Sequence, residues 1–273
     1  MHPFQALILG IIQGITEFLP ISSSGHLIVV PKILGWQDQP LVFDTTMHLA
    51  TALALAVCFW KDIISIIKAF FNDIFSSHRL SLKEYSSNGV LGLAILIGSI
   101  PVGVIGYLWG DKIENLTGTL MWVAAALIFG SILMFIGERG FGKRLIVKDE
   151  VSVKKGLGVG LFQVLSLLPG VSRSGSTISG GMIFGLSRKD ATRFSFLLSI
   201  PAVLAAGFFS LLKSYRLLFA SGTTSLLIGF VSAFLIGVVA IKFLMRFVKT
   251  NTLYPFIIYR ALLALALIFF YFK

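Results

Sequence analysis

Polar and ionisable side chains interrupt two apolar stretches of this chain, one near residue 20 and one near residue 170. In the first break, Ser23 and His26 lie three residues apart and offer a hydroxyl nucleophile and an imidazole that can act as general base or acid. Glu17 and Gln13 lie four residues apart, so they share one face of a helix. Their oxygens suit a hard cation such as Mg²⁺ or Ca²⁺ beside a phosphate group. The first break therefore predicts metal-assisted phosphate chemistry.

Serine and glycine residues in both breaks suit the binding of phosphate. Glycine lets the backbone approach an anion, hydroxyls donate hydrogen bonds, and the N–H groups at a helix N-terminus point at the anion. Arg173 adds a planar guanidinium fork that matches two phosphate oxygens. The serines and glycines predicted to bind substrate are Ser22, Ser24, Gly25, Ser172, Ser174 and Gly175.

Each of these assignments has a structural alternative. Small residues also permit close helix packing, and Glu17 could pair with Arg173 or lie at the water interface. An ionisable residue within a membrane segment is costly, which favours a functional role for Glu17. His26 could be a hydrogen-bonded structural group. Asp44 and His48, four residues apart at the start of a later apolar stretch, are expected to be structural or to support the site from outside it.

The elements that must position these groups lie in a membrane. Hydrophobic residues make up 56% of the 273 residues and charged residues only 13%, which is more apolar surface than one soluble core buries. Apolar stretches are spread along the whole chain, which excludes a removable signal peptide as their explanation. The net charge of +11 comes mainly from residues between these stretches. It indicates the positive-inside rule rather than nucleic-acid binding.

Six apolar stretches, each of roughly 18 to 22 residues, are long enough to cross a bilayer. They cover residues 43–60, 88–109, 118–137, 194–212, 222–242 and 253–272. Shorter apolar pieces flank the two breaks, at 4–19 and 27–34 and at 157–168 and 178–186. Helices of these lengths are too short to cross a hydrocarbon core about 30 Å thick. Each pair of pieces therefore predicts a re-entrant hairpin. The predicted fold is all-α, a polytopic membrane protein with six transmembrane helices plus two re-entrant helical hairpins.

The two breaks also predict an internal repeat. At an offset of 150 residues, Gly10, Gln13, Ser22, Ser24 and Gly25 coincide with Gly160, Gln163, Ser172, Ser174 and Gly175. Each half, 1–140 and 150–273, would hold one hairpin and three spans, and the odd number of spans inverts the second half within a single membrane domain, 1–273. Loop charge then places the basic loops 61–87 and 138–156 inside and both termini outside.

Two motifs give the chain a resemblance to a known family. The stretch from Gln13 to His26, QGITEFLPISSSGH, resembles the first signature of the undecaprenyl-diphosphate phosphatase family linked to bacitracin resistance. The stretch from Pro169 to Gly175, PGVSRSG, resembles its second signature, and the likeness extends over nearly the whole chain. The resemblance implies a bacterial inner-membrane enzyme that hydrolyses undecaprenyl diphosphate to the monophosphate carrier used in cell-wall synthesis, in a divalent-metal-dependent reaction.

The same similarity implies roles for individual residues. Ser23 and His26 would form the catalytic pair, and Glu17 with Gln13 the acidic, metal-binding motif. The diphosphate cradle would comprise Arg173, Ser172, Ser174 and Thr177. Many family members have a glutamate at the position of Gln13, so the resemblance does not extend to a metal held by two carboxylates.

Two mechanisms stay open at this stage. Ser23 could attack phosphorus with His26 as base, giving a phosphoserine, which the sequence favours. Alternatively, a water activated by the metal or His26 could attack while Ser23 only positions the phosphate. The alternative function is a lipid translocase or secondary transporter, because inverted repeats are a transporter architecture. The expected partners are the polyprenyl diphosphate lipid and the bilayer, with a cavity open to the periplasmic side, and the sequence leaves a homodimer open.

Overall fold

Helices account for all the regular structure in the part of the chain that is described. The computed structural model describes residues 1–272 except 38, 76–83, 118, 143–149 and 219–222. The helices are α1 (Pro3–Thr16), α2 (Ser23–Ile33), α3 (Leu41–Cys58), α4 (Trp60–Phe75), α5 (Ser87–Thr117), α6 (Leu120–Gly142), α7 (Val153–Val164), α8 (Arg173–Ile183), α9 (Arg188–Leu218), α10 (Thr223–Phe247) and α11 (Tyr254–Tyr271). A 3₁₀ turn, η2 (Leu165–Leu167), follows α7. The prediction of an all-α fold is confirmed.

Six of the described helices are long and apolar enough to cross a membrane, namely α3, α5, α6, α9, α10 and α11. Each of the six predicted stretches falls on one of them, which confirms the predicted spans. Some helices are longer than the predicted stretches, because polar residues continue the helix beyond the apolar ones. For example, α5 extends through Thr117, whereas the predicted stretch ends at 109. Of the predicted basic loops, the segments 76–83 and 143–149 lie outside the described residues.

The predicted loop 61–87 contains a helix that sequence analysis missed. Here α4 continues in the chain from α3, and its apolar residues recur at helical spacing, with Ile63, Ile66, Phe70 and Phe71 among them. Asp73 near its end is buried and accepts hydrogen bonds from the backbone N–H and hydroxyl of Ser86, at 2.8 and 2.7 Å. This joins the end of α4 to the start of α5.

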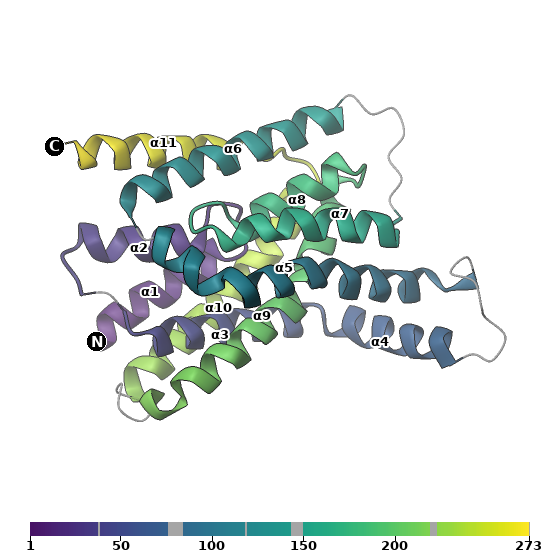
Figure 1. Cartoon of the computed structure of the whole chain (residues 1–273), viewed down its shortest axis with the longest axis horizontal. Coiled ribbons are helices and arrows are strands. Elements are labelled where there is room, and N and C mark those ends of the chain that lie inside the picture. Colours follow the sequence, from purple (N-terminus) through teal and green to yellow (C-terminus); the bar gives the residue numbers. More distant parts are fainter. Residues whose placement is uncertain (38, 76–83, 118, 143–149, 219–222, 273) are drawn as a thin grey trace.

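Short helices flank both breaks and form the two hairpins, α1 with α2 and α7 with α8. Figure 1 shows the first hairpin at the end of the molecule where both termini lie and the second hairpin toward the opposite end. The two breaks thus approach each other from opposite directions. An inverted repeat would produce this arrangement, but the symmetry of the two halves stays a prediction.

The first helix of each hairpin packs against a span from the other half of the chain, α1 against α10 and α7 against α5. Glycine is required at both crossings. A Cβ at Gly10 would lie 2.6 Å from the carbonyl oxygen of Gly229, and a Cβ at Gly160 would lie 2.2 Å from that of Gly98. These contacts are too close for any side chain, so the glycines set the distance between helices.

Apolar packing fixes the first break from behind. Phe18, directly after Glu17, is fully buried, and its ring meets that of Phe196 edge-on, with 5.7 Å between centroids. The same ring lies against Gly237 of α10. Since α9 and α10 both contact this side chain, the chain cannot shift at Glu17 without disturbing two spans.

Candidate active site

The two breaks have the same backbone conformation. Ser22 and Ser172 have φ angles of 77° and 76°, a left-handed region that non-glycine residues seldom adopt. Each serine caps the helix that follows, because its Oγ accepts a hydrogen bond from the N–H of Gly25 at 3.3 Å or of Gly175 at 3.2 Å. The N-termini of α2 and α8 therefore both lie in the breaks, where the helix dipoles favour an anion.

Hydrogen bonds join the two breaks to each other. The backbone N–H of Gly170 donates to Ser24 Oγ at 3.3 Å, and Ser174 Oγ donates to the carbonyl of Leu19 at 3.2 Å. Residues about 150 positions apart in the sequence thus form one unit. Irregular backbone at membrane depth needs such partners, because lipid offers none.

Arg260 of α11, which sequence analysis missed, joins the breaks a second time. Its guanidinium is fully buried and donates to the carbonyls of Pro20 at 3.4 Å, Gly170 at 3.1 Å and Val171 at 3.0 Å. Further bonds reach α6, at Ser131 Oγ and Leu127 O. The signal was an arginine in the middle of a predicted span, since an ionisable residue there indicates a role.

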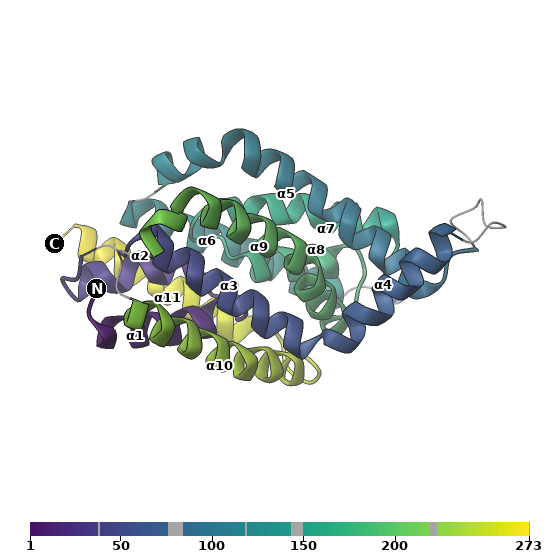
Figure 2. The same ribbon diagram turned by 90° about the horizontal axis from the view of Figure 1, so that it is seen from below.

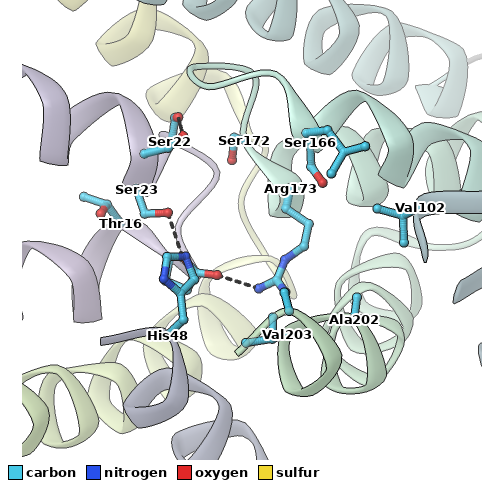
Figure 3. Close-up of a pocket in the computed structure, with 14 residues that line it drawn as sticks. Thr16, Ser22, Ser23, His48, Val102, Ser166, Ser172, Arg173, Ala202 and Val203 are labelled. Atoms are coloured by element: carbon cyan, nitrogen blue, oxygen red, sulfur yellow. Dashed lines mark hydrogen bonds and ion pairs between the residues drawn. The ribbon is translucent and has the colours of Figure 1, made fainter. Parts of the chain in front are cut away.

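Glu17 lies at the centre of the polar residues. Its Oε1 forms an ion pair with Arg173 at 2.8 Å, and its Oε2 accepts hydrogen bonds from Ser23 Oγ at 2.6 Å and Gln13 Nε2 at 3.0 Å. The Glu17 side chain is 7% exposed and that of Arg173 15%. Figure 3 shows Ser23 and Arg173 reaching toward the same point from opposite hairpins. The structure therefore brings Glu17, Ser23 and Arg173 together.

A cavity of about 250 Å³ opens beside this group. Its polar lining comprises Thr16, Glu17, Ser22, Ser23, Ser24, His48, Ser166, Ser172 and Arg173. Its apolar lining comprises Val102 of α5, Leu167 of η2 and Ala202, Val203 and Ala206 of α9. An anion in the cavity would meet the hydroxyls of both breaks and one guanidinium.

The two histidines occupy different places from those expected. His26 is buried outside the cavity lining, with Nδ1 2.7 Å from the carbonyl of Ser22 and Nε2 2.7 Å from the hydroxyl of Tyr259. His48 lines the cavity, and its Nδ1 lies 2.8 Å from the carbonyl of Asp44. A carbonyl only accepts, so Nδ1 of each ring carries the hydrogen and Nε2 of neutral His48 is an acceptor.

The remaining predicted binding residues lie behind the cavity wall rather than in it. Thr177 Oγ1 donates to the carbonyl of Arg173 at 2.7 Å and lies 2.6 Å from Ser195 Oγ. Gly25, Ser174 and Gly175 are buried in the first turns of α2 and α8. These residues hold the backbone of the breaks in place.

Comparison with known proteins then identifies the family. The model of the family described as Bacitracin resistance protein BacA matches residues 6–266. The chain belongs to this family. Among its BacA relatives, a protein of Chlorobium phaeovibrioides is 40% identical over 276 residues, covering 98% of this chain and 96% of the relative. A protein of Thermomicrobium roseum is 41% identical over 283 residues, covering 98% of each. Both relatives are named undecaprenyl-diphosphatase.

The arrangement in this BacA family member can be compared with the needs of a divalent cation. Among the described residues, no three His, Cys, Asp or Glu side chains cluster as a metal site. Gln13 Oε1, however, is buried without a hydrogen-bond partner, beside the carboxylate that its own Nε2 contacts. An orphaned oxygen next to a carboxylate fits a cation that takes its other ligands from water and substrate.

Proposed function

We propose that this protein hydrolyses undecaprenyl diphosphate to undecaprenyl phosphate and inorganic phosphate, which recycles the lipid carrier for cell-wall synthesis. The observation that carries this proposal is the contact of Ser23 with Glu17 at the wall of a polar cavity inside a membrane protein. A hydroxyl bonded to a carboxylate, with an arginine across from it, is suited to attack on a phosphate. The names of the relatives support the choice of substrate.

In the proposed mechanism, Ser23 Oγ attacks the terminal phosphorus of the lipid diphosphate. The bond from Oγ to phosphorus forms, the bond from phosphorus to the bridging oxygen breaks, and lipid monophosphate leaves. Glu17 Oε2, 2.6 Å from Oγ, takes the hydroxyl proton. Water then attacks the phosphoserine, the bond from Oγ to phosphorus breaks, inorganic phosphate leaves, and Glu17 returns its proton to Ser23 Oγ. Glu17 replaces His26 as the base in this scheme, because His26 has both ring nitrogens engaged elsewhere.

Arg173 and the two helix N-termini stabilise the charge that spreads over the phosphoryl oxygens in the transition state. Arg173 is held for this role by Glu17 and by the carbonyl of Ser199, which its Nη1 reaches at 3.5 Å. A divalent cation held by Glu17 and Gln13 would supply further neutralisation of the diphosphate. Thr177 fixes the first turn of α8, on which Arg173 stands.

Phosphate release by the purified protein in detergent tests the proposal. With undecaprenyl diphosphate as substrate, we expect stoichiometric release of inorganic phosphate and formation of the monophosphate. Glu17→Gln, purified in the same way, is the matched control for contaminating phosphatases. Binding of the lipid without any phosphate release would instead favour a translocase, which needs binding groups but no nucleophile.

The divalent metal is a separate proposal with its own test. We expect EDTA to abolish phosphate release, and Mg²⁺ or Ca²⁺ to restore it. Binding of Mn²⁺, followed by its paramagnetic resonance signal in the absence of lipid, should be weakened in Gln13→Leu. Full turnover in EDTA would exclude a metal, and unchanged Mn²⁺ binding in Gln13→Leu would remove this residue from its ligands.

The protein is a multi-pass membrane protein, and we further propose that it lies in the bacterial inner membrane with its cavity open to the periplasm. Positive-inside counting supports this orientation. In a Cys58→Ala background, we expect Lys154→Cys to stay unlabelled by an impermeant thiol reagent added to intact cells. Gln37→Cys, near the end where the termini lie, should be labelled. The reverse pattern would invert the topology.

A further inference from the structure

A second cavity, of about 360 Å³, lies between α4, α5 and α9. Its wall is almost wholly apolar and includes Ile66 and Phe70 of α4, Leu96 of α5, and Ile200 and Pro201 of α9. The volume lies in the range of small-molecule sites. A ligand held here must be hydrocarbon, because the wall offers it nothing polar.

This cavity and the polar cavity follow one seam between two spans. On α5, Leu96 lines the apolar cavity and Val102 the polar one. On α9, Ile200 and Pro201 line the apolar cavity, and the next residue, Ala202, lines the polar one. Two helices thus carry a polar and an apolar site end to end, which matches a ligand with a charged head and a hydrocarbon tail.

Proline in both helices explains why the seam is open there. Pro101 and Pro201 lie inside α5 and α9, where each removes a helical hydrogen bond and disfavours straight packing. Figure 2 shows α5 arching over the rest of the molecule. In the predicted repeat, α3 corresponds to α9 and α10 corresponds to α5. The seam between α3 and α10 is closed. There a Cβ at Gly229 would lie 2.6 Å from the ring of Phe43.

An ion pair lies one helical turn from the apolar cavity. Arg193 of α9 forms an ion pair with Asp62 of α4. These residues lie one helical turn before Leu197 and Ile66, both of which line the cavity. The charged pair makes this side of the cavity unfavourable for hydrocarbon, so a chain is expected to extend from the cavity toward the polar cavity or the bilayer.

We propose that the cavity between α4, α5 and α9 binds part of the isoprenoid chain of the substrate whose diphosphate lies against Ser23 and Arg173. This proposal rests on the proposed function and adds the site that recognises the length of the lipid. The chain passes between the spans at Pro101 and Pro201. A diphosphate with a single isoprene unit ends before the cavity and gains nothing from it.

Filling the cavity tests the proposal. Leu96→Trp and Ile200→Trp place an indole in it, and Leu235→Trp, on the lipid-facing side of α10 and outside both cavities, is the matched control. With undecaprenyl diphosphate, we expect the two cavity variants to lower kcat/KM by about tenfold or more, comparable to the loss of about two buried methylenes. With dimethylallyl diphosphate, kcat/KM should stay within about twofold of the unsubstituted protein, since the expected loss is confined to the tail.

The outcomes separate the two proposals. If the unsubstituted protein releases no phosphate from either substrate, the proposed function fails. If it is active and the cavity variants lose activity equally on both substrates, or on neither, the chain-binding site is wrong. A second measurement does not depend on the variants. A polyprenyl diphosphate with a diazirine in the third or fourth isoprene unit should cross-link to peptides of α4, α5 or α9, and cross-links only to α10 or α11 would overturn the proposal.

Discussion

The two breaks have the same backbone conformation at Ser22 and Ser172, which lie 150 residues apart. Both serines have a positive φ, both cap a following helix, and both caps bond a glycine three residues on, Gly25 or Gly175. Even the contact of the cap hydroxyl with the next-but-one serine recurs, at 3.4 Å in the first break and 3.2 Å in the second. The chain therefore builds the same helix-capping turn twice.

The side chains on this shared backbone differ where chemistry is needed. Ser23 of the first break corresponds to Arg173 of the second, and Glu17 corresponds to Leu167. One break thus supplies the proposed nucleophile and the carboxylate, and the other supplies the guanidinium. The comparison teaches that two copies of one turn can carry different side chains, and the proposed reaction uses those that differ.

The largest expected effect is on the charged pair that unites the breaks. Glu17→Gln and Arg173→Ala should each lower kcat/KM by at least about a hundredfold, as for other groups that stabilise a transition state. For the control Leu167→Met, at the position equivalent to Glu17, kcat/KM should stay within a few-fold of that of the unsubstituted protein. Phosphate release measures activity, and thermal unfolding in detergent checks the fold, because loss of one partner leaves the other charge buried. Near-normal turnover in Glu17→Gln would remove this residue from the site.

Ser23→Ala distinguishes a nucleophile from a positioning hydroxyl. If Ser23 attacks phosphorus, the loss should match that of Glu17→Gln, and the double variant should be scarcely worse than either single one, since residues that act as a unit are strongly non-additive. Rapid quenching with labelled lipid diphosphate should trap phosphate on Ser23. If water attacks instead, Ser23→Ala loses one hydrogen bond to a charged group, about ten- to a hundredfold, and no adduct forms.

A smaller effect is expected at His26, the residue with serine as its counterpart in the second break. His26→Gln should lower kcat/KM by about tenfold at most, the equivalent of one net hydrogen bond, because the ring bonds Ser22 and Tyr259 and not Ser23. Tyr259→Phe removes the same contact and should give a similar loss. A loss at His26 as large as at Ser23, with Tyr259→Phe unaffected, would restore the histidine as the general base.

The smallest effect concerns the shared caps and is one of stability. Ser22→Ala and Ser172→Ala should each lower the free energy of unfolding by about 1 kcal/mol, as for other N-cap serines. Ser→Gly at either position should lower the free energy of unfolding by less than Ser→Ala, because glycine adopts a positive φ without strain. Denaturant unfolding in detergent measures both. Clearly unequal losses would show that the two turns are not equivalent in energy.

Much of the fold could be predicted from the sequence. Uninterrupted apolar stretches identified the six spans, because a bilayer requires about 20 apolar residues per helix. The short pieces beside Pro20 and Pro169 identified the hairpins for the same reason. The helix α4 was missed because its charged residues made the segment resemble a basic loop, although its apolar residues recur at helical spacing, and the structure packs it against α5.

The sequence selected several side chains that the structure brings together, but it did not reveal how they meet, and their roles stay predictions. Residue types and the 150-residue offset selected Glu17, Ser23 and Arg173, since buried ionisable groups and paired Ser/Gly turns are rare in apolar segments. Only the tertiary structure decided that Ser23 meets Glu17 rather than His26, that His48 faces the cavity, and that Arg260 joins the breaks. Contacts between residues far apart in the sequence, such as those of Arg260 with Gly170 and Val171, depend on how the helices cross. Those crossings follow from close contacts such as that of Gly10 with Gly229, which spacing along one chain cannot reveal.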